Sequence, residues 1–441
     1  MSRERVIINN LLAFCLALGF VCLTFVYLPG VVPHTAVASA PEMSLPMASL
    51  VQLPETTKTT FVPQEAPGQT VIARFTPEPE PQLPMGLLVP EPRVKVEAPT
   101  EAVTPEVIKG GPPLARPSSL ATAAAMRNAK GQQRPDWLTV PATLAPDVEF
   151  WKKIYADYTS NQIVLHDARD LKIVYRVLDV TDTRRDPFLN DLEKEKRVEA
   201  TVEDARNTIK AMLQRIASSE TASGFTDDEW MIYKTFQPLP GGREKYLAAA
   251  DRIRAQQGLK DKFVEGLKYS GRMLGEMEAI FEARGLPMEL TRLVFVESMF
   301  NPAAHSAVGA SGLWQIMPST ARRYGLMVGR HVDDRRDPIL ATRAAAKILQ
   351  ENYDDLGSWP LAINAYNSGL GRMRRAVTQL GTKDIADIVR RFEHPGYAFA
   401  SRNFFCEFLA AVEVTERAPA YFGSITYDEP VAVSDSSTSY Q

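Results

Sequence analysis

The segment from residue 33 to residue 145 limits where this chain can form a hydrophobic core. It includes TPEPEPQLPMGLLVPEPRVKVEAPTEAVTPEV (76–107), which is rich in proline and acidic residues and has no sustained apolar period. Such a composition cannot bury enough apolar surface to offset the entropy lost on ordering. We expect a disordered tether that extends at most ~3.1 Å per residue where it is polyproline-like. Folded structure is expected only after residue 145.

The start of the chain predicts export. An uncharged run, LLAFCLALGFVCLTFVYLPGVV, occupies residues 11–32 after two arginines and a glutamate at 3–5. It is long enough for a transmembrane helix, and the preceding positive charge places residues 1–10 in the cytoplasm. A cleaved signal peptide is the alternative, because ASA at 38–40 resembles a cleavage site. We favour an uncleaved inner-membrane anchor with the folded part in the periplasm.

Composition excludes several classes of function. The formal net charge of −3 gives no basic excess that would indicate nucleic-acid binding. The five histidines have no metal-ligand spacing. Cys15 and Cys22 lie in the apolar run, which leaves Cys406 without a partner for a disulfide. No glycine-rich nucleotide loop or GxSxG motif occurs. We therefore expect no metal and no cofactor.

Residues 146–270 predict a helical scaffold. LEKEKRVEATVEDARNTIKAMLQRIAS (192–218) has the period of a long amphipathic helix. Shorter helices are expected at 226–235, 243–256 and 259–270, and short extended pieces at 161–167 and 170–180. No group of residues with an evident chemical role occurs in this region.

Residues 271–415 also predict helices, so the expected fold class is mainly α. Asp337 and Pro338 are a suitable N-cap and first helical residue, and Gly357 ends that helix. A second helix is expected to begin after Ser358 and to end at Gly369. The polar residues 416–441 are expected to form a flexible tail.

One acidic residue lies in an unfavourable setting. PMELTRLVFVESMF (287–300) predicts a helix, in which Glu297 shares a stripe with Leu290, Leu293 and Val294. Burial among apolar side chains raises the pKa of a carboxyl, which keeps a proton available near neutral pH. A glutamate in a buried ion pair is the alternative interpretation.

Two further stretches contain polar or aromatic residues suited to a glycan. In GASGLWQIMPSTA (309–321), a glycine-bearing loop leads into a helix and presents Trp314 and Gln315. Aromatic faces suit sugar rings and amides bind their polar groups, although Trp314, Ile316 and Met317 also fit a core. In INAYNSG (363–369), Tyr366 and Asn367 carry polar groups that could orient a carboxyl or a sugar. The alternatives are that Tyr366 lies in the core and that Asn367 caps the helix. The charge run 322–338 predicts a solvated loop with local salt bridges.

Together these stretches resemble a known family. ES (297–298), GASGLWQIMPSTA and AYNSG (365–369) are similar to the three signature stretches of soluble-lytic-transglycosylase-type catalytic domains. VDDRRDP (332–338) resembles the membrane-bound lytic murein transglycosylase D branch, and the resemblance covers roughly 275–415. It implies a goose-lysozyme-like fold of the 271–415 domain. It also implies cleavage of the β-1,4 bond between N-acetylmuramic acid and N-acetylglucosamine in peptidoglycan.

The resemblance assigns roles residue by residue. Glu297 becomes the catalytic acid and base, and Ser298 orients it or the acetamido group of the substrate. The implied substrate-binding residues are Gly312, Trp314, Gln315, Met317, Tyr366 and Asn367. An ordinary glycosidase needs two carboxylates, yet no second acid near Glu297 in the sequence has a comparable context. A transglycosylase needs only one, because the muramoyl 6-hydroxyl attacks C1 and closes a 1,6-anhydro ring without water.

The chain also departs from the family pattern. No lysine-motif wall-binding repeat follows the catalytic region. Phe404 occupies the position of a usual tyrosine, so Tyr366 or Tyr397 would have to supply a hydroxyl near the glutamate. The competing functions are a hydrolytic muramidase and a non-catalytic peptidoglycan-binding envelope protein.

Overall fold

The computed structural model describes residues 134–431. The predicted cytoplasmic segment 1–10, the apolar segment 11–32 and most of the predicted linker lie outside these residues. Within 134–431, no helix is both long enough and apolar enough to cross a membrane.

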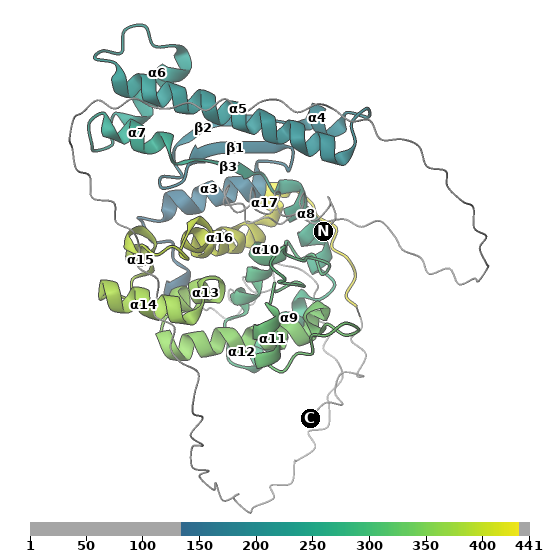
Figure 1. The fold of residues 1–441 in the computed structure, drawn as a ribbon. Coiled ribbons are helices and arrows are strands. Elements are labelled where there is room, and N and C mark those ends of the chain that lie inside the picture. Colours follow the sequence, from purple (N-terminus) through teal and green to yellow (C-terminus); the bar gives the residue numbers. More distant parts are fainter. Residues whose placement is uncertain (1–133, 432–441) are drawn as a thin grey trace, which may run out of the picture. The chain divides into compact units, whose positions relative to one another are not determined.

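The described chain is mainly helical, as predicted (Figure 1). Its first part contains η1 (Asp136–Leu138), α3 (Ala145–Ala156), β1 (Gln162–Asp167), β2 (Val174–Asp179), α4 (Thr181–Arg185), α5 (Asp191–Ser218), α6 (Asp227–Phe236), α7 (Glu244–Ala250), β3 (Ile253–Gln257) and α8 (Lys260–Ser270). Its second part contains α9 (Leu274–Ala283), η2 (Met288–Arg292), α10 (Leu293–Ser298), α11 (Pro318–Arg323), η3 (Asp334–Arg336), α12 (Pro338–Leu356), α13 (Trp359–Ser368), α14 (Leu370–Leu380), α15 (Ile385–Arg391), α16 (Phe399–Glu416) and α17 (Ala418–Phe422).

A small antiparallel sheet corrects one helix prediction. The strands are ordered β2-β1-β3, with Val164 opposite Val177 on one side and Gln256 on the other. The helix predicted over 243–256 ends at Ala250, and the chain then enters β3. Burial in β3 alternates, with Ile253 and Ala255 inside. This period of two belongs to a strand, and pairing with β1 overrides the local helical preference.

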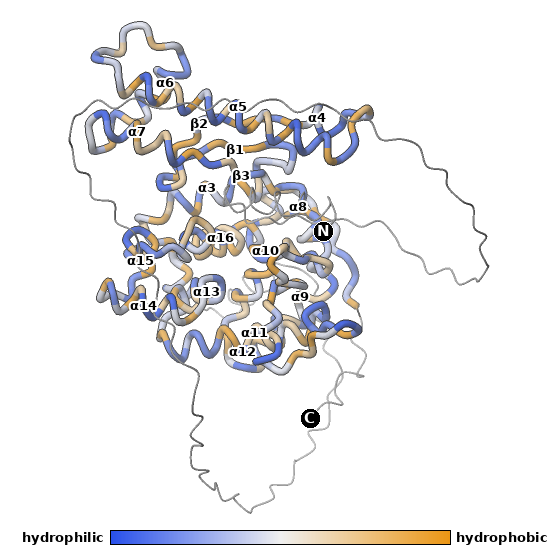
Figure 2. The backbone as a smooth tube through the Cα atoms, viewed as in Figure 1, coloured by the Kyte–Doolittle hydropathy of each residue, from blue (hydrophilic) through white to orange (hydrophobic). Residues whose placement is uncertain are grey.

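The sheet separates two hydrophobic cores. Ile163 and Leu165 of β1 face the core that contains the buried stripe of α5, whereas Val164 faces the core that contains α3 and α8. Figure 1 shows β1 between α5 and α3. Alternating orange and blue along α5 in Figure 2 reflect its amphipathic sequence. The second core continues into residues 274–418, so the predicted boundary at residue 270 does not divide the hydrophobic packing.

Both ends of the folded part extend beyond their predicted limits. Leu138 and Leu144, inside the predicted linker, are fully buried. At the other end, the Asp428 carboxylate lies 2.7 Å from the Arg272 guanidinium, and the Val431 amide donates to the Arg272 carbonyl at 3.0 Å. The expected linker and tail are therefore wrong at residues 134–144 and 416–431, because apolar anchors and backbone hydrogen bonds hold these segments.

The two long helices after the charge run match their predictions. The Asp337 carboxylate caps α12 by accepting from the amides of Ile339 and Leu340, each at 2.8 Å. Gly357 ends α12 with φ 66°, and Gly369 follows α13. These caps depend only on the residues at the helix ends, so they can be located from the sequence alone.

Candidate active site

Glu297 lies at the end of a helix that is shorter than predicted. α10 ends at Ser298, and the next two residues, Met299 and Phe300, adopt φ angles of 51° and 57°. Left-handed conformations cost non-glycine residues on the order of 1 kcal/mol each. The helical pattern through Phe300 is therefore overridden by the packing that fixes this turn.

Aromatic packing and one glycine hold the turn after Glu297. The ring centroids of Phe300 and Phe295 lie 4.7 Å apart, and those of Phe295 and Phe263 of α8 lie 4.8 Å apart. On the same helix, a Cβ at Gly266 would lie 2.5 Å from the Met299 carbonyl oxygen. The missing side chain at Gly266 therefore lets the α8 backbone approach the strained turn directly.

The carboxyl of Glu297 is set among apolar groups but is not sealed off. Leu293, Val294 and Phe295 are fully buried, whereas Glu297 is partly exposed. Desolvation by burial raises its pKa to about 8. Within 134–431 no ion pair includes Glu297, so the buried ion-pair interpretation is wrong here. The buried pair in this region joins Arg292 to Glu278.

Ser298 connects α10 to the loop that carries the second signature. Its Oγ is fully buried and lies 2.8 Å from the Leu313 carbonyl and 3.2 Å from the Val294 carbonyl. Its proton is thereby committed to backbone oxygens. The side chain of Ser298 therefore links α10 to the 309–317 loop by a hydrogen bond.

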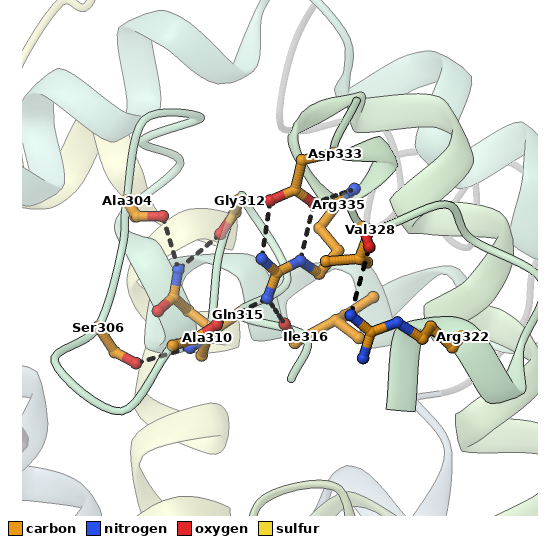
Figure 3. A network of polar contacts seen from close by, with 11 residues as sticks. Ala304, Ser306, Ala310, Gly312, Gln315, Ile316, Arg322, Val328, Asp333 and Arg335 are labelled. Carbon is orange, nitrogen blue, oxygen red and sulfur yellow. Dashed lines mark hydrogen bonds and ion pairs between the residues drawn. The ribbon is translucent and has the colours of Figure 1, made fainter. Parts of the chain in front are cut away.

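Gly312 is required by the conformation of that loop. It has φ 78°, and a Cβ there would lie 1.8 Å from the Arg335 carbonyl oxygen. Gly312 accepts a hydrogen bond of 2.8 Å from Gln315 Nε2, which also donates to Ala304 at 3.2 Å (Figure 3). Gln315 itself has φ 45°. The loop therefore holds the side-chain nitrogen of Gln315, while Gln315 remains partly exposed.

Arg335 braces this loop from the charge run. Its guanidinium donates to the carbonyls of Gly309 at 2.6 Å and Ile316 at 2.9 Å, and it forms a fork with both oxygens of Asp333 (Figure 3). Arg335 is buried, so the solvated loop predicted for 322–338 is wrong at this position. The RRDP sequence does not distinguish the buried arginine from its exposed neighbour Arg336.

Trp314 and Met317 differ in burial, although by sequence either residue could bind substrate or lie in the core. Trp314 is fully buried; its Nε1 donates to Thr342 Oγ1 at 2.8 Å and its ring stacks on Phe281. A buried ring offers no face to a sugar, so direct substrate contact by Trp314 is contradicted. Met317 is 38% exposed, so its core alternative is wrong, whereas Ile316 is buried as a core residue.

The third signature stretch reaches the same site. The Tyr366 hydroxyl donates to the Trp314 carbonyl at 2.9 Å, and burial and the charge of Glu297 raise its pKa. Asn367 is exposed and its Oδ1 accepts from Ser401 Oγ at 2.8 Å. Glu297, the Trp314 loop and Tyr366 are thus adjacent. No interaction joins Tyr397 to Glu297, although both lie in the described part of the chain.

The structure adds two residues that sequence reasoning missed. Burial, and to a smaller extent the charge of Glu297, raise the pKa of Glu407 on α16 to about 8. Tyr155 on α3 is 1% exposed and interacts electrostatically with both carboxyls. Glu407 carries the same signal as Glu297, a lone acid in the apolar stretch FFCEFLAA. Nothing in the sequence around Tyr155 distinguishes it.

Comparison with known families agrees with this geometry. The family model described as the transglycosylase SLT domain matches residues 278–389. This segment is similar to the transglycosylase SLT domain. It contains Glu297, the 309–317 loop and Tyr366, whereas Tyr155 and Glu407 lie outside the matched residues of the SLT domain.

Curated relatives also match part of the chain. Membrane-bound lytic murein transglycosylase D of Escherichia coli (strain K12) is 41% identical over 135 residues, which are 29% of this chain and 29% of that protein. Membrane-bound lytic murein transglycosylase F of Maricaulis maris is 33% identical over 138 residues, or 27% and 29% of the two chains. The chain therefore spans less than a third of the length of either relative.

Solved structures show a weaker likeness. The 70 kDa soluble lytic transglycosylase of Escherichia coli is 18% identical, with a TM-score of 0.29 over 54% of this chain and 38% of that chain. An inactive mutant of the lytic transglycosylase Slt from Pseudomonas aeruginosa is 19% identical, with a TM-score of 0.29 over 49% and 38%. A TM-score of 0.29 is too low for either structure to define the fold of this chain.

Proposed function

We propose that this protein is a peptidoglycan lytic transglycosylase. It cleaves the β-1,4 bond between N-acetylmuramic acid and N-acetylglucosamine and leaves 1,6-anhydromuramic ends. The observation that carries the proposal is Glu297, a partly exposed carboxyl inside an SLT domain. Burial raises its pKa to about 8, and no cation pairs with it within 134–431. Such a group holds a proton at neutral pH and can deliver it to a substrate.

The proposed reaction uses this carboxyl twice. Glu297 donates its proton to the glycosidic oxygen, and the C1–O bond breaks while the N-acetyl oxygen of the substrate stabilises C1. The resulting Glu297 carboxylate then accepts the proton of the muramoyl 6-hydroxyl as that oxygen bonds to C1. The acetamido group is released, the anhydro ring closes and Glu297 is protonated again, so no water is consumed.

The surrounding residues divide into two groups in this proposal. Gln315, Met317 and Asn367 retain exposed surface and are proposed to contact the glycan. Ser298, Gly312 and Trp314 are buried and are proposed to hold the loop that carries Gln315 and Met317. Tyr366 links the groups, because its ring lies beside Trp314 and its hydroxyl is part of the same hydrogen-bonded frame.

The proposal also includes an envelope location and a fold. The uncharged run 11–32 and the linker after it suit an inner-membrane anchor with the enzyme in the periplasm, with signal cleavage as the alternative. The matched relative from Escherichia coli is named membrane-bound, which favours the same location. The family match favours a lysozyme-like arrangement of residues 271–415.

Digestion of purified sacculi tests the activity. Wild-type protein should release muropeptides that are lighter by one water than hydrolysis products, as measured by mass spectrometry. Glu297→Gln should lose at least about a hundredfold in turnover while still binding glycan, as expected when a general acid is removed. Glu220→Gln alters an exposed glutamate just after α5; it is the matched control and should keep wild-type turnover.

Three outcomes would contradict the proposal in different ways. Products with reducing ends would identify a hydrolytic muramidase. Binding of sacculi without any release would identify a non-catalytic wall-binding protein. Unchanged turnover in Glu297→Gln would remove Glu297 from the reaction, whatever the products are.

A further inference from the structure

A cavity of about 320 Å³ lies outside the residues that match the SLT domain. Its wall is formed by the loop after β1, the middle of α5, the residues around β3 and the first turn of α16. The described residues of this wall include one carboxylate, that of Asp251, and five arginines, which are Arg169, Arg206, Arg252, Arg254 and Arg402. Such a concentration of guanidinium groups indicates a site for an anion.

Carboxylates outside the wall do not use up the donors of these arginines. Glu393 is shared by two of them, lying 2.7 Å from Arg169 and 2.9 Å from Arg402. Asp167 accepts from Nε of Arg252 at 3.1 Å and from its Nη2 at 2.9 Å, which leaves Nη1 of Arg252 without a hydrogen bond within 134–431. In the same range, Nε of Arg206 is buried and has no partner. Guanidinium N–H groups therefore remain available to a ligand.

The ring of Phe399 fixes the orientation of Arg254 in the wall. The guanidinium carbon of Arg254 lies 4.0 Å from the ring centroid of Phe399. The ring is held in turn by Trp151 and His166, whose ring centroids lie 6.3 Å and 5.7 Å from it. Burial, and to a smaller extent the charge of Arg206, lower the pKa of Arg254 to about 10, so Arg254 is still charged at neutral pH. A stacked guanidinium keeps its N–H groups at its edge, where a planar carboxylate accepts two of them.

One turn of α16 connects this cavity to the proposed glycan site. Phe399 and Arg402 line the cavity, whereas Ser401 of the same turn donates from Oγ to Oδ1 of Asn367 at 2.8 Å. Asn367 is exposed and is proposed above to contact the glycan. An α-helix with its side chains is about 10 Å wide, and an extended peptide of about five residues reaches ~16 Å. A peptide attached to a sugar beside Asn367 is therefore long enough to reach the cavity.

We propose that the arginine-lined cavity binds the carboxylates of the peptide stems of peptidoglycan. The proposal rests on the function proposed above, because the N-acetylmuramic acid residues of that substrate carry these stems. Four of the five arginines, Arg169, Arg206, Arg252 and Arg254, come from the region before residue 271. That region then selects the substrate by its stems, in addition to supporting the segment that carries Glu297.

Calorimetric titration of the full-length protein with a stem peptide tests the site directly. The probe is synthetic L-Ala-γ-D-Glu-meso-diaminopimelate-D-Ala, and a second titration uses the same peptide with its carboxylates amidated. Arg206→Gln should bind the free acid about tenfold more weakly than wild type, because a charge-assisted hydrogen bond is lost. Arg169→Gln, at the exposed rim, should weaken binding in the same direction. Arg197→Gln is the matched control, since it removes an exposed charge of the same helix α5 outside the cavity, and it should bind as wild type does.

Three results of the titration would overturn the proposal. The first is equal affinity for the free and the amidated peptide. The second is unchanged affinity for the free acid in both Arg206→Gln and Arg169→Gln. The third is tighter binding of inorganic phosphate than of the stem peptide in a competition titration, which would assign the cavity to a phosphate-bearing ligand.

Turnover of two substrates tests whether stem binding serves the reaction. Wild type is compared on sacculi and on glycan strands from which an amidase has removed the stems, and the ratio of the two kcat/KM values is measured. This ratio should favour sacculi in wild type and fall about tenfold in Arg206→Gln, mainly through a higher KM on sacculi. Arg197→Gln should keep the wild-type ratio, and an unchanged ratio in Arg206→Gln would count against the proposal. If wild type releases no muropeptides, the function proposal fails, whereas the calorimetric titration still decides whether the cavity binds stems.

Discussion

The hydroxyl of Tyr366 donates a 2.9 Å hydrogen bond to the main-chain carbonyl of Trp314. This contact joins α13 to the loop that carries Gln315, and it brings the Tyr366 ring close enough to Glu297 for the two to interact electrostatically. Two stretches that lie 52 residues apart in the sequence are therefore one structural unit beside the proposed acid.

Tyr366→Phe should lower stability by about 1 kcal/mol, because it removes this hydrogen bond and leaves the Trp314 carbonyl without its donor. Urea unfolding followed by circular dichroism measures the change. Tyr353→Phe, a tyrosine on the surface of α12, should change stability by less than about 0.5 kcal/mol. If the two variants were equally stable, the hydrogen bond would not contribute to holding the loop.

Stability should fall with rising pH because of Glu297. Its pKa is about 8 in the folded protein and 4.5 as an ordinary carboxyl, so between these values the unfolded chain releases a proton that the folded chain retains. The free energy of unfolding therefore decreases as pH rises through this window. Glu297→Gln lacks this loss and should be more stable than wild type at pH 8, by roughly 2–4 kcal/mol.

Urea unfolding of both proteins at pH 5 and pH 8 measures this effect. Glu220→Gln, which alters an exposed carboxyl, should follow the wild-type curve. A difference between Glu297→Gln and wild type that stays the same at both pH values would contradict a raised pKa for Glu297.

Gly312→Ala should destabilise the protein by about 2–4 kcal/mol, since it adds strain at φ 78° and places a Cβ 1.8 Å from the Arg335 carbonyl oxygen. Gly309→Ala separates the two causes. Gly309 also has a positive φ, 95°, but the nearest atom to a Cβ there is 4.0 Å away. Gly309→Ala should lower the free energy of unfolding by only about 1 kcal/mol, as measured by thermal or urea unfolding. Equal losses in both variants would show that the close contact at Gly312 relaxes.

Much of the fold could be predicted because its signals are local. The caps at Asp337 and Gly357 and the apolar stripe of α5 lie within a few residues of the structure that they determine. The strand Ile253–Gln257 could not be recognised in the same way, because its conformation depends on pairing with β1, about ninety residues earlier in the chain.

In the candidate site, too, residues with a local sequence signal could be predicted and residues that depend on distant contacts could not. Glu297 could be found because a charged residue in an apolar stripe is visible in the sequence. For Trp314 both a glycan contact and a core position were open from the sequence, and the core position is decided by Phe281 and Thr342, which pack on its ring from elements distant in sequence. The proximity of Tyr155 and Glu407 to Glu297 depends on how α3, α10 and α16 pack, and no local pattern encodes that arrangement.

The brace formed by Arg335 leads to the last prediction. Arg335→Lys keeps the positive charge but loses the planar fork that binds Asp333 and two loop carbonyls together. The carbonyls of Gly309 and Ile316 would lose donors in a buried setting, so stability should fall by about 2–4 kcal/mol. Because Gln315 lies in the released loop, turnover of sacculi should fall as well, mainly through a higher KM. Arg336→Lys, at the exposed neighbouring position, should leave both quantities close to wild type. Arg335→Lys with wild-type stability and KM would show that the loop keeps its conformation without the fork.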